Sequence, residues 1–138
     1  MMNMRSFIGV PCAAVAIATG MPAVAQDGET VTQHFNQAIP NSPGKSLLAY
    51  FVDYAPGGAS ASHAHAKSAF VFAYVLSGKI ESQVNEEPKR VYHAGESWYE
   101  MPGSIHRVSR NASTTAPAKL LAVFVADTDE KDLTTPLK

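Results

Sequence analysis

The sequence predicts an all-β fold, a sandwich or barrel made of many short strands. Three observations support this fold class. Apolar and aromatic runs of strand length recur along the chain, turn-forming residues separate them at intervals of about 8–12 residues, and no segment keeps a helical period. The length of 138 residues fits one domain, and the net charge of −1 argues against a nucleic-acid-binding protein.

The expected strands begin with residues 46–54 (SLLAYFVDY), an aromatic and apolar run that ends at the turn Pro56-Gly57-Gly58. Residues 69–76 (AFVFAYVL) form a continuous apolar strand, which the tight Ser77-Gly78 connection joins to a half-exposed strand at 79–85. Residues 26–43 are expected to form an arm or an irregular lead-in strand, and the polar tail after Asp127 is expected to fray. Four shorter strands are expected at residues 90–93, 97–100, 106–110 and 119–126.

The first 25 residues have the composition of a secretory signal peptide. Arg5 is the only charged residue before Asp27, and Ala23-Val24-Ala25 provides the small residues of a cleavage site. The apolar run between them is too short, and too interrupted by proline and glycine, for a stable membrane span. We therefore expect residues 1–25 to be a signal peptide, residues 26–138 to be one β-barrel domain, and the protein to be periplasmic or secreted.

Three histidines are candidate metal ligands. His63 and His65 are separated by one residue, and positions i and i+2 of a strand point to the same face of a sheet. His106 belongs to a later strand that can lie beside them in a barrel. Neutral imidazole nitrogens bind divalent iron, manganese, zinc, nickel or copper. Thiolate ligands are excluded, because the only cysteine, Cys12, lies in the expected signal peptide. The sequence therefore predicts a site for one divalent transition metal ion.

Two stretches of the chain carry a resemblance to a known family. Residues 57–78 (GGASASHAHAKSAFVFAYVLSG) look like the first motif of the cupins, with a glycine, His-x-His and a closing glycine. Residues 95–111 (GESWYEMPGSIHRVSRN) resemble the second motif, with a Pro-Gly turn, a histidine and an asparagine. The resemblance to the cupin superfamily implies a small double-sheet jelly-roll barrel with a metal ion deep inside. It also implies that His63, His65 and His106 take the family's histidine positions, and that the chain forms a homodimer.

The acidic ligand of the first cupin motif is absent. The family pattern places a glutamate seven residues before Gly78, where this sequence has Val71. One interpretation is a three-histidine site with open positions for substrate, water or dioxygen. In a second, Glu100 or Glu96 of a later strand replaces the carboxylate. In a third, the site has lost its metal and the pocket binds a small molecule unaided. The second motif also contains two extra residues, which indicate a β-bulge that could re-aim a side chain.

The predicted function is that of an exported metalloprotein that oxidises or isomerises a small organic molecule, as a metal-dependent dioxygenase or isomerase does. Tyr99 and Glu100 are the candidate catalytic residues, since one face of their short strand must look inward and an inward tyrosine can donate a proton. Val71, Ala73 and Val75 are expected to make the pocket apolar. The alternative is a barrel that binds a sugar or an acid without catalysis, because the fold supports unrelated functions.

Overall fold

The computed structural model describes residues 28–138, so the expected signal peptide at residues 1–25 lies outside the described residues. Every regular element in this part of the chain is a strand, and it contains no helix that could cross a membrane. The all-β prediction is confirmed. The strands are β1 Glu29–Ala38, β2 Lys45–Tyr54, β3 His63–His65, β4 Phe70–Ser77, β5 Lys79–Val84, β6 Arg90–His93, β7 Ser97–Glu100, β8 Ile105–Asn111, β9 Ala118–Asp127 and β10 Thr134–Pro136.

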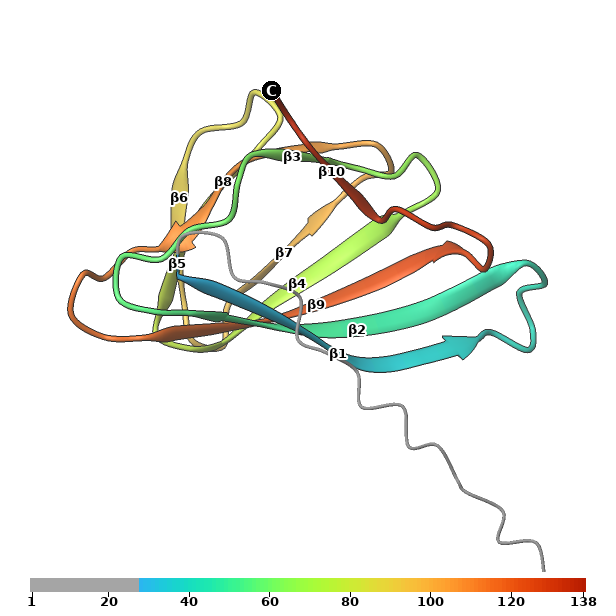
Figure 1. Ribbon diagram of the computed structural model, residues 1–138, viewed down its shortest axis with the longest axis horizontal. Helices are drawn as coiled ribbons and strands as arrows, with labels where there is room; N and C mark the ends of the chain where they lie inside the picture. Colours follow the sequence, from blue (N-terminus) through green and yellow to red (C-terminus); the bar gives the residue numbers. More distant parts are fainter. Residues whose placement is uncertain (1–27) are drawn as a thin grey trace, which may run out of the picture.

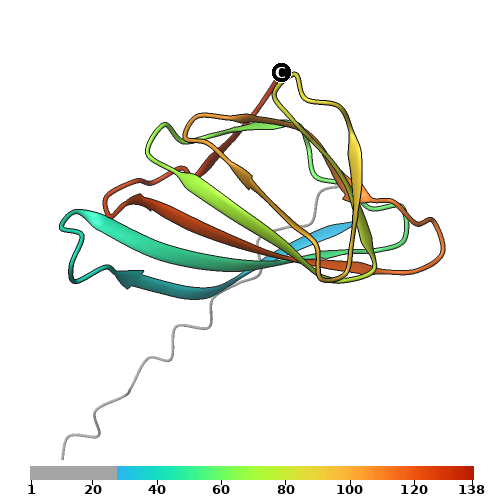
Figure 2. The same cartoon turned by 180° about the vertical axis from the view of Figure 1, so that it is seen from behind.

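The strands form two five-stranded antiparallel sheets that lie face to face (Figure 1). One sheet has the strand order β1-β2-β9-β4-β7, and the other has the order β10-β3-β8-β5-β6. Most neighbouring strands, such as β2 with β9 or β3 with β8, thus come from distant parts of the chain, as in a double-sheet jelly-roll barrel. Seen from behind, the hairpin of β1 and β2 extends past the edge of the other sheet (Figure 2).

The core lies between the two sheets, because side chains on a strand alternate between its two faces. In β9, every second residue from Ala118 to Ala126 is buried, and in β5 the buried positions include Ile80 and Val84. The buried apolar side chains form two clusters, one that includes Trp98 and one that includes Phe124. The period of two in the sequence therefore decides which side chains can reach the interior.

The turn between β4 and β5 requires glycine. Gly78 has a φ of 70°, and a Cβ atom at this position would lie 2.6 Å from the carbonyl oxygen of Pro117 and 2.9 Å from Cα of Ala118. Glycine alone satisfies both the positive φ and the close approach of the backbone. Through this turn the chain passes from one sheet to the other, since β4 and β5 belong to different sheets.

Two segments are more regular than the sequence predicts. The lead-in segment contains β1, which pairs with β2 along its length, with one register shift between Gln33 and Phe35. The tail contains β10, which pairs with the whole of β3. The prediction of a frayed tail is wrong. Backbone hydrogen bonds hold β10 in place while its three side chains stay exposed, so hydrophobic patterning gives no sign of the strand.

Candidate metal centre and its cavity

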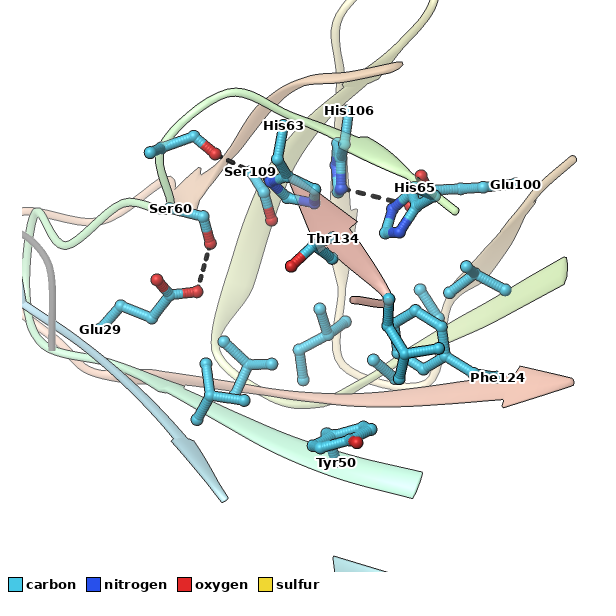
Figure 3. Close-up of a pocket in the computed structure, with 18 of the residues that line it drawn as sticks. Glu29, Tyr50, Ser60, His63, His65, Glu100, His106, Ser109, Phe124 and Thr134 are labelled. Atoms are coloured by element: carbon cyan, nitrogen blue, oxygen red, sulfur yellow. Dashed lines mark hydrogen bonds and ion pairs between the residues drawn. The ribbon is translucent and has the colours of Figure 1, made fainter. Parts of the chain in front are cut away.

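Strands β3 and β8 bring the three predicted histidines together. His63 pairs directly with His106, and one ring nitrogen of each histidine lies within 4.8 Å of the others (Figure 3). The ring centres are 4.9 Å apart for His63 and His65, 5.3 Å for His63 and His106, and 6.1 Å for His65 and His106. His65 and His106 are buried. The predicted convergence of the three imidazoles is confirmed.

The spacing of these nitrogens is close to that of a metal centre. Metal–imidazole bonds are about 2.0–2.1 Å long, so nitrogens bound to one ion lie no more than about 4.2 Å apart. The limit of 4.8 Å in this structure is slightly wider. Small rotations of the imidazole rings would therefore bring the three nitrogens to bonding distance from one ion.

A neighbouring strand supplies a carboxylate. Glu100 of β7 pairs directly with Val71 of β4, so it enters the interior beside the position at which the cupin pattern places its glutamate. Glu100 is 2% exposed, with Oε2 at 2.8 Å from Nε2 of His65 and Oε1 at 3.2 Å from Nδ1 of His106. The Nε1–H group of Trp98 donates a hydrogen bond of 3.1 Å to Oε1. This geometry favours the interpretation in which Glu100 takes the place of the missing acidic residue.

Several buried polar atoms at this site have no hydrogen-bond partner among the described residues. They are both ring nitrogens of His65 and Oε2 of Glu100, because the 2.8 Å contact between the two residues lacks the alignment of a hydrogen bond. A buried polar atom left unpaired costs about 1–3 kcal/mol. A cation between them would satisfy an imidazole lone pair and a carboxylate oxygen together, so the donor set fits a divalent metal ion.

The tautomer of His63 also fits a metal ligand. Its Nδ1 lies 2.8 Å from the carbonyl oxygen of Ala61, which can only accept a hydrogen bond. Nδ1 therefore carries the proton, and Nε2 keeps its lone pair. Histidine ligands of metals commonly use one ring nitrogen for the ion and donate from the other in this way.

Electrostatics keep the site in a form that binds cations. Burial lowers the pKa of His106 to about 4, and burial also lowers the pKa of His63, although the hydrogen bond to Ala61 opposes it. Burial acts to raise the pKa of Glu100, but His65, His106 and Trp98 outweigh it, so this pKa lies below its ordinary value. At neutral pH the site therefore offers the neutral imidazoles of His63 and His106 and the negative charge of Glu100.

The other candidates on β7 and beside it lie at the surface. Trp98 and Glu100 are buried, while Tyr99 between them is 64% exposed on the outer face. A strand turns only one of two adjacent side chains inward, so the inward position of Glu100 excludes Tyr99 from the interior. The inward orientation considered for Tyr99 is thus not the one observed. Glu96, the other candidate carboxylate, accepts a hydrogen bond from the backbone N–H of His93 on the surface.

A β-bulge in β8 turns a second polar side chain inward. The pairing of β5 with β8 skips Arg107, which is exposed. As a result His106 and Ser109 are both buried and line the same cavity, although residues three apart on a regular strand point to opposite faces. The predicted bulge is confirmed, and it does re-aim a side chain.

The histidines line a cavity of about 350 Å³ between the sheets, near the low end of the size range of small-molecule sites. Val71 and Ala73 line it as expected, whereas Val75 belongs to the adjacent core. Lys131 and Thr134, both exposed, contribute to its edge from the C-terminal segment. The wall is otherwise mainly apolar, with Val31, Tyr50, Val52, Leu120, Ala122, Phe124, Leu133 and Pro136 among its residues.

A chain of four hydrogen-bonded polar side chains lines another part of this cavity. Ser60 donates to Oε1 of Glu29, its Oγ lies 2.6 Å from the hydroxyl of Tyr54, and that hydroxyl lies 2.8 Å from Oγ of Ser109. Burial raises the pKa of Tyr54 to about 12, and burial raises the pKa of Glu29 although the hydrogen bond from Ser60 opposes it. The sequence does not predict this chain, because its members are widely spaced and Glu29 falls in the expected arm.

A double-sheet barrel with three inward histidines on β3 and β8 is the architecture of a cupin. The chain belongs to the cupin family, since the cupin domain matches residues 50–124, more than half of the chain. No curated protein sequence matches it significantly.

Several solved structures share the fold. Recombinant oxalate oxidase in complex with glycolate is 24% identical, with a TM-score of 0.58 over 76% of this chain and 54% of that chain. The protein TT1209 from Thermus thermophilus is 27% identical, with a TM-score of 0.52 over 62% and 76%. The DMSP lyase DddQ from Ruegeria pomeroyi is 22% identical, with a TM-score of 0.54 over 65% and 42%. The chain spans 54% and 63% of the lengths of two oxalate oxidase chains that it matches.

Proposed function

We propose that this protein is an exported cupin metalloprotein that binds one divalent transition metal ion and oxidises or isomerises a small organic molecule. The proposed ligands are His63, His65, His106 and the carboxylate of Glu100. The observation that carries the proposal is the convergence of these groups on one cavity, with buried polar atoms that have no partner among the described residues. An ion in this position supplies Lewis acidity or activates dioxygen.

Other residues of the chain orient the proposed ligands. Trp98 donates to the carboxylate of Glu100, and Oγ of Ser82 lies 2.9 Å from Nε2 of His106. Removal of partners of this kind typically costs about 10–100-fold in metal affinity. Trp98 and Ser82 are therefore expected to strengthen metal binding as well as to hold the ligands in place. The apolar side chain of Val71 lies beside the site, which favours a substrate with a hydrocarbon part.

The structural relatives are compatible with an enzyme and do not select a reaction. An oxalate oxidase and a DMSP lyase share the fold, so cupin barrels of this shape support enzymes. Identities of 24% and 22% carry neither reaction to this chain, because one fold hosts many chemistries.

We further propose that the protein is exported to the periplasm or secreted, on the basis of residues 1–25, and that it forms a homodimer. Phe70, Phe72 and Tyr99 are 38%, 40% and 64% exposed on neighbouring strands, and such an apolar surface favours association. Sequencing the N-terminus of the secreted form would test the cleavage site. Light scattering after size-exclusion chromatography would test the dimer.

A barrel that binds a small molecule without catalysis is the second candidate. The polar chain from Glu29 to Ser109 favours it, because it gives the cavity a hydrogen-bonding wall outside the metal centre. A small molecule that co-purifies and remains unchanged after prolonged incubation with the metal-loaded protein would support the binding protein. Turnover of that molecule would support the enzyme.

Elemental analysis of the mature protein, produced without a histidine tag, tests the metal centre. We expect about one transition metal ion per chain in the wild type and none in the triple variant His63→Ala/His65→Ala/His106→Ala. His93→Ala is the matched control, because His93 is exposed and lies outside the cavity lining. Wild-type protein that stays metal-free after reconstitution with iron(II), manganese(II) or zinc(II) would overturn the metalloprotein proposal.

A further inference from the structure

We infer that the polar chain Glu29–Ser60–Tyr54–Ser109 is a second subsite of the cavity, which binds a hydrogen-bond-donating group such as a hydroxyl on the substrate. This inference rests on the proposed function, since the other end of the same molecule would face the histidines. All four residues line the cavity that the metal centre also lines. Glu29 and Ser60 lie on the side away from Glu100 (Figure 3).

The carboxylate of Glu29 fixes the donor and the acceptor in each hydrogen bond of the polar chain. An ionised carboxylate only accepts, so Ser60 donates its one hydroxyl proton to Oε1 of Glu29. Ser60 must then accept from Tyr54, and Tyr54 must accept from Ser109, because each hydroxyl has a single proton to give. All three hydroxyl protons are thereby used within the chain.

The polar chain therefore presents hydrogen-bond acceptors, and no free donor, to the cavity. The acceptors are the remaining lone pairs of the three hydroxyl oxygens and the Oε2 atom of Glu29. This Oε2 atom has no hydrogen-bond partner within residues 28–138. A ligand group that donates can bind here, whereas an ether, which only accepts, cannot. The apolar wall that includes Val52 and Leu120 suits a hydrocarbon body. The substrate class is thus a small molecule with an oxygen ligand, such as a carboxylate, at one end and a hydroxyl at the other.

Stabilisation of the barrel does not explain why a carboxylate occupies position 29. The two serines alone satisfy the hydroxyl of Tyr54, which is 2% exposed. The carboxyl group adds a half-buried negative charge to a network that is otherwise neutral, and burial raises its pKa, so the ionised form is held at a cost. A carboxylate at this position is therefore better explained by hydrogen bonding to a bound ligand than by stabilisation of the fold.

Binding of matched carboxylates to the zinc-loaded protein tests the inference. The probes are straight-chain ω-hydroxycarboxylates of increasing length, each compared with its ω-methoxy counterpart by isothermal titration calorimetry. We expect the wild type to bind at least one hydroxy acid about 10–100-fold more tightly than the ether, the worth of one hydrogen bond to a charged group. Glu29→Gln should lose this preference, because its amide nitrogen can donate to the ether. Glu29→Ala should lose it too, because the carboxylate acceptor is gone and the Ser60 hydroxyl, freed from Glu29, can donate to the ether.

Glu87→Gln is the matched control, since Glu87 is exposed in the turn after β5, and it should keep the preference. Thermal unfolding and zinc content show whether each variant is folded and loaded. The inference is overturned if the zinc-loaded wild type binds none of the hydroxy acids, binds each pair equally, or keeps its preference after Glu29→Gln. Failure of the proposed function is seen separately, as wild-type protein that takes up no zinc.

Discussion

Replacing Glu100 with glutamine would remove one negative charge from the candidate metal centre and keep the shape of the side chain. In the metal-free protein the effect on stability should be small. Burial lowers the pKa of His106 to about 4, so this ring is neutral and loses no ion-pair partner, and the glutamine oxygen can still accept from Trp98. We expect the free energy of unfolding of the metal-free variant to lie within about 1 kcal/mol of the wild type.

The effect of Glu100→Gln on metal binding should be much larger. The carboxylate oxygens lie 2.8 Å and 3.2 Å from two of the three histidines, so an ion among those rings would contact the charge directly. Loss of a residue that only orients a ligand already costs about 10–100-fold in affinity. We therefore expect zinc affinity to fall by about 100-fold or more, which is about 2.7 kcal/mol. In excess zinc, the variant should lose about the same amount of metal-dependent stabilisation.

Competition with a chromophoric chelator measures the zinc affinity, and urea unfolding with and without zinc measures the two stabilities. Glu96→Gln is the control, because this glutamate lies on the surface and should leave both quantities unchanged. Zinc binding by Glu100→Gln as tight as in the wild type would refute the carboxylate ligand and leave a three-histidine site. A loss above about 3 kcal/mol in the metal-free variant would show instead that Glu100 balances a buried positive charge.

Three further predictions concern the same centre. The exchange Val71→Glu/Glu100→Val should recover most of the zinc affinity that Glu100→Val loses, since the two positions are register partners; affinity no better than in the single variant would contradict this. Metal-free protein should lose about 3 kcal/mol of stability as the pH falls from 6.5 to 4, because unfolded His106 takes up a proton near its ordinary pKa of 6.5 and folded His106 only near 4. A flat profile in urea unfolding would count against the burial of this ring. Tyr99→Phe should leave zinc affinity and any turnover unchanged, because the side chain is 64% exposed; a loss of either would show that Tyr99 turns inward.

The sequence is sufficient to predict the histidines because their spacing matches the period of a strand. Positions two apart must share a face, and the later histidine stands after a Pro-Gly turn, so three ligands can be chosen without coordinates. The strand that contains Glu100 gives no such sign. In the segment SWYE each face carries one aromatic and one polar residue, so alternation alone cannot tell which face is inward. Its pairing with β4 decides this, and that pairing is a tertiary contact.

The sequence predicts neither the polar wall of the cavity nor strand β10, and the reason is different in each case. Glu29 and Ser109 belong to distant strands, and the closure of the barrel links them through Ser60 and Tyr54, which no local pattern encodes. Strand β10 is held through its backbone while its side chains remain exposed. Hydrophobic periodicity reports only side chains that avoid water, so it misses an element of this kind.

The position of the short strand β3 in the chain decides how late the candidate metal centre can be assembled. It has three residues, and its two neighbours in the sheet, β8 and β10, both follow it much later in the chain. His63 and His65 therefore emerge during synthesis as a loose pair, which can bind ions such as zinc, copper, iron or nickel only weakly. The three histidines are in register only after β8, which carries His106, has paired with β3. If the protein is exported as proposed, the metal ions present where it folds, and not those present where it is made, would compete for the centre.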